Sequence, residues 1–155
     1  MKFKRIAISV VGVLILIAAA SVFAQMNRPY RNGTVWDIGF IRMKPGMESA
    51  YMNYLSGSWK KEQEALKKEG LIISYKIISV EGHTPGEFNL MLMTEYKDLA
   101  SMEAGEQKAD ALMQTVIGSD DKQMQGYKER SEIREIIGNR LGREIVLEPR
   151  KTQSE

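Results

Sequence analysis

The sequence predicts one α+β domain in which a four-stranded antiparallel sheet carries its helices on one face. Three observations predict this class. β-Branched and apolar stretches are bounded by Gly and Pro. Stretches with apolar residues three or four apart lie between them. Their order along the chain reads β-α-β-β-α(α)-β, and the roughly 130 residues after position 24 suit one domain with a hydrophobic core.

The first half of the domain predicts a strand, a long helix and a second strand. Residues 34–43 read as a strand that Lys44-Pro45-Gly46 ends. Residues 48–69 predict a helix, with Gly70 as its C-terminal stop. Gly57 weighs against a straight helix, because an interior glycine costs about 1 kcal/mol. The largely apolar stripe of this helix comprises Tyr51, Tyr54, Leu55, Ser58, Trp59, Glu62 and Leu66. Residues 71–80 are rich in β-branched side chains and predict the second strand.

The second half predicts a hairpin, two helices and a last strand. Residues 82–86 form a Gly/Pro loop that contains His83, and residues 87–96 predict the third strand. Asp98 is placed to cap a second helix, which Gly105 is expected to break. Ser119 is placed to cap a third helix over residues 120–137. Residues 143–147 predict the fourth strand, and the polar residues 149–155 are expected to be a disordered tail.

This order is the split βαβ arrangement of a ferredoxin-like fold, whose sheet has a second face that something must cover. Strand alternation separates two sets of residues. The set that is apolar throughout is assigned to the helices: Trp36, Ile38, Phe40, Ile73, Tyr75, Ile77, Phe88, Leu90 and Leu92. The other set is apolar but contains polar groups: Val35, Asp37, Gly39, Ile41, Ile72, Ser74, Lys76, Ile78, Asn89, Met91, Met93 and Glu95.

Polar residues on the mixed face are the candidate site. A second subunit that covers this face would enclose them, and a ligand would then fit between the subunits. The predicted ligand-binding residues are Asp37, Lys76, Asn89, Met91 and Glu95. An enclosed carboxylate among them would act as a general base, and Asn89 would position a carbonyl group. The alternative is an ion pair between Lys76 and a carboxylate that ties strands together.

Two segments resemble the dimeric α+β barrel superfamily. A strand that runs into Ile41-Arg42-Met43-Lys44-Pro45-Gly46-Met47-Glu48 is similar to its first repeat, and Thr94-Glu95-Tyr96-Lys97-Asp98-Leu99 is similar to the second. The element order over residues 34–147 agrees, and the chain looks most like exported members whose activities are uncharacterised. The resemblance implies a homodimer whose two sheets form one barrel. Superfamily activities include cofactor-independent monooxygenases, haem enzymes, isomerases and ligand-sensing modules, so the fold does not select one.

The first 24 residues predict export. Lys2, Lys4 and Arg5 precede an apolar run over residues 6–20, which is the layout of a signal peptide cut after Ala24. The alternative is an uncleaved inner-membrane anchor, because the apolar run over residues 6–24 approaches the about 20 residues of a membrane span. Residues 25–33 are polar and predict a linker, and residues 34–148 form the predicted domain. The location is then periplasmic or secreted, with membrane contact only through an uncleaved segment.

Charge and composition exclude several classes of function. Residues 1–24 hold three of the 22 basic residues and none of the 20 acidic ones, which leaves 19 against 20 and no basic footprint for nucleic acid. The chain has no Cys and one His, so thiol nucleophiles, disulfides and multi-histidine metal centres are excluded. We predict no cofactor and no metal. The expected function is an exported homodimer that binds a small, partly apolar ligand. The alternatives are a monooxygenase-like oxidoreductase with Asp37 or Glu95 as base, and a purely structural dimer.

Overall fold

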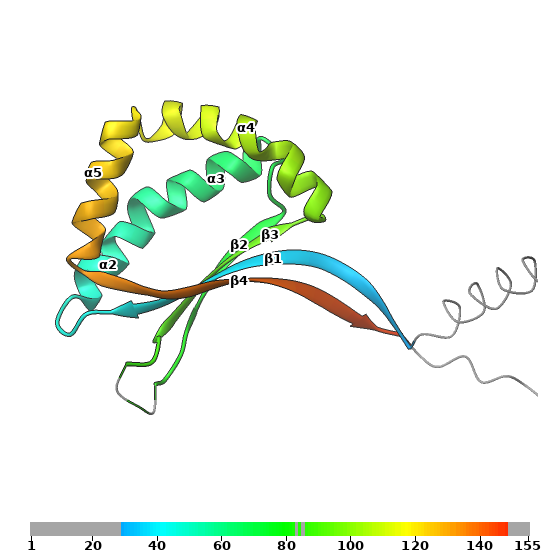
Figure 1. Cartoon of the computed structure of the whole chain (residues 1–155), viewed down its shortest axis with the longest axis horizontal. Helices are drawn as coiled ribbons and strands as arrows, with labels where there is room; N and C mark the ends of the chain where they lie inside the picture. The colour runs from blue at the N-terminus through cyan, green and yellow to red at the C-terminus, as the bar shows by residue number, and fades with distance from the viewer. Residues whose placement is uncertain (1–28, 83, 85, 149–155) are drawn as a thin grey trace, which may run out of the picture. The chain divides into compact units, whose positions relative to one another are not determined.

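The structure is a computed structural model that describes residues 29–82, 84 and 86–148 (Figure 1). Residues 34–144 form one compact unit, and the described residues 29–33 and 145–148 belong to a second. The elements are β1 (Tyr30–Met43), α2 (Glu48–Tyr54), η1 (Leu55–Trp59), α3 (Lys60–Lys68), β2 (Ser74–Ser79), β3 (Leu90–Tyr96), α4 (Leu99–Val116), α5 (Asp120–Ser131) and β4 (Arg134–Leu147).

The four strands form one sheet in the order β2-β3-β1-β4. β3 pairs antiparallel with both β1 and β2, with Gly39 opposite Leu92 and Ile77 opposite the same Leu92. Because β3 lies between β1 and β2, the first helical segment crosses over a strand, as in a split βαβ unit. Within residues 34–144 the helices lie over the same side of the sheet (Figure 1). The predicted ferredoxin-like α+β class is confirmed.

The turn after β1 follows from its sequence. The Met47 N–H donates to the Lys44 carbonyl at 2.9 Å, and Gly46 has φ +77°. Pro at the second position and a positive φ at the third are the requirements of a type II turn. The Lys44-Pro45-Gly46 sequence therefore sets where β1 ends and where α2 begins.

The predicted helix over residues 48–69 is present, with a π-helical turn in its middle. Leu55–Trp59 forms η1, which contains Gly57, between α2 and α3. The helix ends in a Schellman motif, in which the N–H groups of Leu71 and Gly70 donate to the carbonyls of Leu66 and Lys67. π-Turns inside helices are rare, and many of those that occur lie at functional sites. The irregularity expected at Gly57 is thus a π-helical turn within a continuous helix and not a break.

The core joins this helix to the sheet. Tyr51, Leu55 and Trp59 pack with Ile41 of β1 and Leu90 of β3, and each is no more than 8% exposed. Alternation through the strand register then defines two faces. The helix face comprises Val35, Asp37, Gly39, Ile41, Tyr75, Ile77, Leu90, Leu92 and Thr94. The open face comprises Trp36, Ile38, Phe40, Lys76, Ile78, Met91, Met93 and Glu95.

The predicted assignment of faces is right for the residues inside β2 and β3 and wrong for β1. Trp36, Ile38 and Phe40 lie on the open face, although they are the more apolar set of that strand. Phe88 and Ile72 were also misplaced, because each lies just outside its strand, where alternation does not apply. Phe88 packs edge-on against Phe40 of the open face at 4.7 Å between ring centres. Ile72 is buried at 5% exposure.

The second half of the chain differs from the expectation in two places. α4 is continuous through Gly105. A Cβ at position 105 would lie 3.1 Å from the Leu71 side chain, so the glycine allows these two segments to approach closely. The third helix ends at Ser131, so the run Ile133 to Ile137 leads into and forms part of β4 and does not continue the helix. Asp98 caps α4 as expected by accepting from the Ser101 N–H at 2.7 Å. Ser119 holds the cap position of α5 without a side-chain hydrogen bond.

The second compact unit contains the far ends of β1 and β4. β1 begins at Tyr30 and not at residue 34 as expected from the sequence. The Glu148 N–H donates to the Pro29 carbonyl at 2.8 Å, and the Arg31 Nε lies 3.2 Å from the Glu148 carboxylate. These contacts join the two described segments of this unit to each other.

Several expectations fall outside the described residues. The predicted signal peptide, the tail over residues 149–155 and His83 are among them. Across residues 29–82, 84 and 86–148, no helix has the length and apolar character that a membrane span requires.

We expect Gly57→Ala to raise the free energy of unfolding by about 0.5–1 kcal/mol. An added Cβ there meets no atom within 4 Å, and alanine lowers the conformational entropy that folding removes. Gly70→Ala is the matched control and should destabilise by about 1 kcal/mol, because Gly70 has φ +69°. Urea unfolding followed by circular dichroism measures both. A loss of stability in Gly57→Ala would mean that the π-turn itself requires glycine.

Candidate functional site

A cavity of about 270 Å³ lies between the helix face of the sheet and the helices, within residues 34–144. We call it the helix-side cavity. Its floor includes Gly39, opposite Leu92, where a strand residue without a side chain leaves room above the sheet. The core side chains Tyr51 and Trp59 form part of its wall. The cavity is therefore a continuation of the core that the side chains do not fill.

The wall of this cavity is partly apolar and partly polar. Its apolar and aromatic residues are Ile41, Tyr51, Tyr54, Trp59, Leu92, Tyr96 and Ile136. Its polar residues are Asp37, Gln63, Thr94, Arg130, Arg134 and Asn139. An apolar cavity with a few convergent polar groups is the usual form of a small-molecule site.

Asp37 is the acidic group of the cavity wall. It comes from the middle of β1, is half-buried and lies opposite Thr94 of β3. Burial raises the pKa of the Asp37 carboxyl above its usual 3.8, and a hydrogen bond from the Ile38 backbone partly opposes this. A half-buried carboxyl with a raised pKa is suited to exchange a proton with a molecule in the cavity.

Two arginines form the cationic side of the cavity. The Arg130 guanidinium of α5 lies 4.9 Å from the centre of the Tyr54 ring, and that of Arg134, at the start of β4, lies 5.8 Å from the Tyr51 ring. These distances are within the range of cation–π attraction. Burial raises the pKa of Tyr51 to about 12, although Arg134 and Arg130 lower it in part, so the ring stays a neutral phenol.

Hydrogen bonds hold the polar wall in place. Thr94 of β3 donates its hydroxyl to the Oε1 of Gln63 on α3 at 3.1 Å, and Gln63 is 8% exposed. The Asn139 Oδ1 on β4 lies 3.3 Å from where a Cβ of Gly39 would be. A side chain at position 39 would press on Asn139, so the glycine keeps this amide at the cavity floor.

The residues predicted as one site are divided between the two faces of the sheet. Asp37 lines the helix-side cavity, whereas Lys76, Met91 and Glu95 lie on the open face. The structure therefore does not bring Asp37 together with Lys76. Asp37 is opposite Thr94 and Lys76 is opposite Met93. Thr94 and Met93 are consecutive residues of β3, so their partners lie on opposite faces of the sheet.

The other predicted site residues have structural contacts. The Lys76 Nζ lies 4.0 Å above the centre of the Trp36 ring, and it forms no ion pair among the described residues. Glu95 accepts hydrogen bonds from the hydroxyls of Thr34 and Ser74. The Asn89 Oδ1 accepts from the Met43 N–H at 2.9 Å, which ties the end of β1 to the strand beside it. Met91 lies opposite Phe40.

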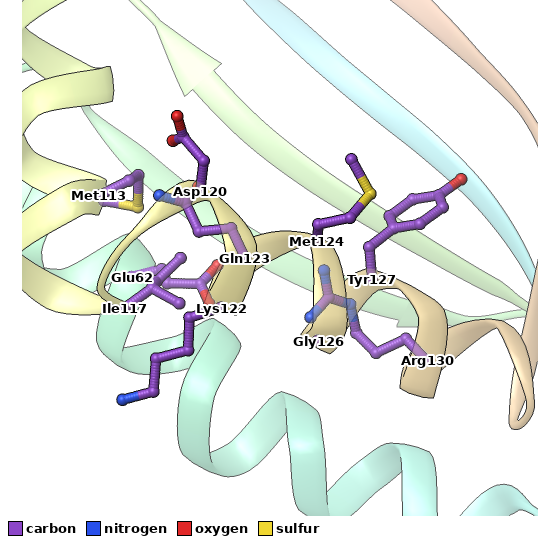
Figure 2. A pocket seen from close by; sticks show the side chains of 10 residues that line it. All are labelled: Glu62, Met113, Ile117, Asp120, Lys122, Gln123, Met124, Gly126, Tyr127 and Arg130. Atoms are coloured by element: carbon purple, nitrogen blue, oxygen red, sulfur yellow. The ribbon is translucent and has the colours of Figure 1, made fainter.

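A larger, more open cavity of about 690 Å³ lies against α5 (Figure 2). Met124 and Tyr127 line it from α5, and Glu62 lines it from α3. Arg130 lines both cavities, so the two share one guanidinium. Burial raises the pKa of the Glu62 carboxyl, and the nearby Arg130 lowers it in part.

Sequence reasoning missed most of the cavity wall. Arg130 and Arg134 fall within the helix predicted over residues 120–137, near its C-terminal end, where basic side chains are common because of the helix dipole. Gly39 and Asp37, the small and polar positions of β1, are the sequence signal that was available. Within the described ranges, no group of three or more His, Cys, Asp or Glu residues could hold a metal ion.

The structure is similar to ferredoxin-like proteins of known structure. A dimeric ferredoxin-like protein from an uncultured marine organism is 11% identical, with a TM-score of 0.48 over 76% of this chain and 90% of the other. HapK from Hahella chejuensis is 12% identical, with a TM-score of 0.44 over 70% and 90%. A NIPSNAP family protein from Agrobacterium tumefaciens is 15% identical, with a TM-score of 0.42 over 78% and 93%.

No protein-family model matches the chain. None of the curated proteins matches it either.

We expect the change in stability caused by Asp37→Asn to be more favourable at pH 7 than at pH 3. A carboxyl with a raised native pKa favours folding only while it is protonated. That contribution is lost as the pH rises from about 3.8 through the native pKa. The asparagine removes the loss, with a gain of at most about 1 kcal/mol because the group is partly solvated. Thermal unfolding of both proteins at the two pH values measures this, with the exposed Asp110→Asn as control. An Asp37→Asn effect that is the same at both pH values contradicts the prediction.

Proposed function

We propose that the protein is an exported homodimer that binds a small, partly apolar organic molecule in the helix-side cavity. The observation that carries this proposal is the convergence of Asp37, Arg130, Arg134 and Asn139 on a cavity with aromatic walls. The predicted location of the ligand thereby moves from the open face to the helix face. Export is inferred from the signal-like residues 1–24.

The size of the cavity limits the ligand. Its volume of about 270 Å³ is slightly below the about 300 Å³ at which pockets for drug-sized molecules begin. We therefore expect a molecule of one or two rings. Leu92, Tyr96 and Ile136 are among the less buried apolar and aromatic residues of the wall, and they offer the surface against which such a ring packs.

The homodimer is inferred from the open face of the sheet. Trp36, Ile38, Phe40, Met91 and Met93 are half-buried there without a described helix over them, and Ile78 is 39% exposed. Apolar area contributes about 25 cal/mol per Å² when it leaves water, so a second copy on this face is favoured. The ferredoxin-like neighbours described as dimeric are compatible with this arrangement.

We expect a ligand to shift the indole N–H signal of Trp59 and to leave that of Trp36 unchanged. The chain has two Trp residues, and they lie on opposite faces of the sheet, Trp59 in the cavity wall and Trp36 beneath Lys76. Titration of ¹⁵N-labelled protein with 2-naphthamide, a neutral two-ring probe, measures both signals. Trp36→Phe assigns them.

A larger side chain at the cavity floor should weaken this response. We expect Gly39→Val to weaken binding of the probe at least about tenfold, which corresponds to about 1.4 kcal/mol. Gly138→Val on β4 is the matched control, because a Cβ there approaches only the Arg140 side chain, at 3.7 Å. Equal loss in both variants, or a probe that shifts the Trp36 signal instead, would count against the helix-side cavity.

Dimerisation has its own test. We expect light scattering to give a dimer for residues 25–155 at micromolar concentration, and Ile78→Glu to give a monomer, because a buried unpaired carboxylate opposes association. Met52→Glu places the same charge on α2, where Met52 is 44% exposed, and should leave the dimer intact. A stable monomer of the unmodified chain would contradict the proposal.

A second candidate function is a cofactor-independent, monooxygenase-like oxidoreductase. The observation that favours it is the half-buried Asp37 carboxyl with its raised pKa inside the cavity. Glu95, the other predicted base, is held by two hydroxyl groups on the opposite face. Oxygen uptake in the presence of a phenolic substrate, lost in Asp37→Asn, would distinguish catalysis from binding alone.

A further inference from the structure

The arginines of the helix-side cavity lack an acidic partner. Among the described residues, the ion pairs within 4 Å involve Arg31, Arg42 and Lys108, and neither Arg130 nor Arg134. The Nε atoms of both arginines are buried, and neither has a hydrogen-bond partner within the described part of the chain. A guanidinium is always charged, and a buried donor left unsatisfied costs about 1–3 kcal/mol. The described residues therefore supply no partner for these two donors, and both arginines line the cavity, where their guanidinium groups are available to an anionic group.

The neighbouring charges do not cancel the two cations. Glu62 faces Arg130 from α3, on the side of the larger cavity, and forms no ion pair with it. Asp37 lines the same cavity from β1 and likewise forms no ion pair among the described residues. The rings of Tyr51, Tyr54 and Tyr127 face the guanidinium groups and attract cations without neutralising them. Arg134 in particular faces two tyrosine rings.

The backbone near Arg130 provides the space that its side chain needs. Gly126 lies one turn before Arg130 on α5, and a Cβ at Gly126 would be 3.0 Å from the Arg130 Nη1. Figure 2 shows Arg130 beside Gly126 and Tyr127. Glycine at position 126 therefore leaves room for the guanidinium to lie against the helix and over the Tyr54 ring.

We propose that the occupant of the helix-side cavity is a flat aromatic or conjugated carboxylate, whose carboxylate is bound by Arg130 and Arg134 and whose ring packs among Leu92, Tyr96 and Ile136. This rests on the proposed binding function and names its ligand class. The planar fork of arginine matches the two oxygens of a carboxylate. The apolar and aromatic part of the wall favours such a molecule over a small, fully hydrated inorganic anion, which would leave that surface uncovered.

The test compares two probes of the same shape that differ in charge. 2-Naphthoate and 2-naphthamide are titrated separately into the purified protein, and dissociation constants are obtained from the Trp59 indole signal. We expect the carboxylate to bind at least about tenfold more tightly than the amide at low salt, and the preference to fall as salt is added. Equal affinities would overturn the carboxylate proposal and leave the binding function intact. Absence of binding by both probes would overturn both.

Variants assign the preference to the two arginines. We expect Arg134→Gln and Arg130→Gln each to bring the carboxylate-to-amide ratio close to one, while the amide still binds. Arg143→Gln removes the same charge from an exposed position of β4 and should keep the ratio. Because the amide reports that the cavity has formed, a misfolded variant is recognised directly. If a glutamine variant does not fold, Arg134→Lys replaces it. It keeps the positive charge without the planar guanidinium group and should show an intermediate carboxylate-to-amide ratio. A ratio unchanged in these variants refutes the assignment.

Discussion

The packing of α2 and η1 on two strands determines the rest of this structure. Tyr51, Leu55 and Trp59 meet Ile41 and Leu90, and this contact fixes which face of the sheet the helices cover. It also fixes where the core ends, because two residues before Ile41 the strand presents Gly39 and then Asp37. The helix cannot fill the space above a glycine, so the cavity begins there. The π-turn at Leu55–Trp59 lies directly at this contact, and both of these end residues pack in the core.

The cavity combines features that folding alone does not favour. Two guanidinium groups, a half-buried carboxyl and a missing side chain all reduce the apolar area that the core can bury. Hydrophobic contacts nearby offset this cost, since Tyr51 and Leu55 are almost completely buried. Proteins tolerate such local departures from good packing mainly at functional sites. The position of the departures is thus physically more informative about function than the fold itself.

The sequence was sufficient for the fold class and insufficient for the site. Lys44-Pro45-Gly46, Gly70 and Asp98 have local chemistry that determines a turn, a helix end and a cap, and all three were predicted correctly. The face of β1 depends instead on tertiary packing. Trp36, Ile38 and Phe40 are more apolar than Asp37 and Gly39, so the pattern favoured the wrong side. Ile136 and Ile137 lie in β4, although the preceding helix pattern extended through them, because pairing beside β1 overrides local preference.

The helices differ in how firmly they are attached. α4 and α5 contain no fully buried side chain, and Met124 and Tyr127 of α5 are 58% and 50% exposed. Segments with few buried apolar contacts open at a lower free energy than the whole domain unfolds. The Arg130 side of the cavity can therefore separate from the sheet while Tyr51, Leu55 and Trp59 keep their places. Because the cavity is already open to solvent, such an opening of α5 would widen its entrance and speed the exchange of molecules.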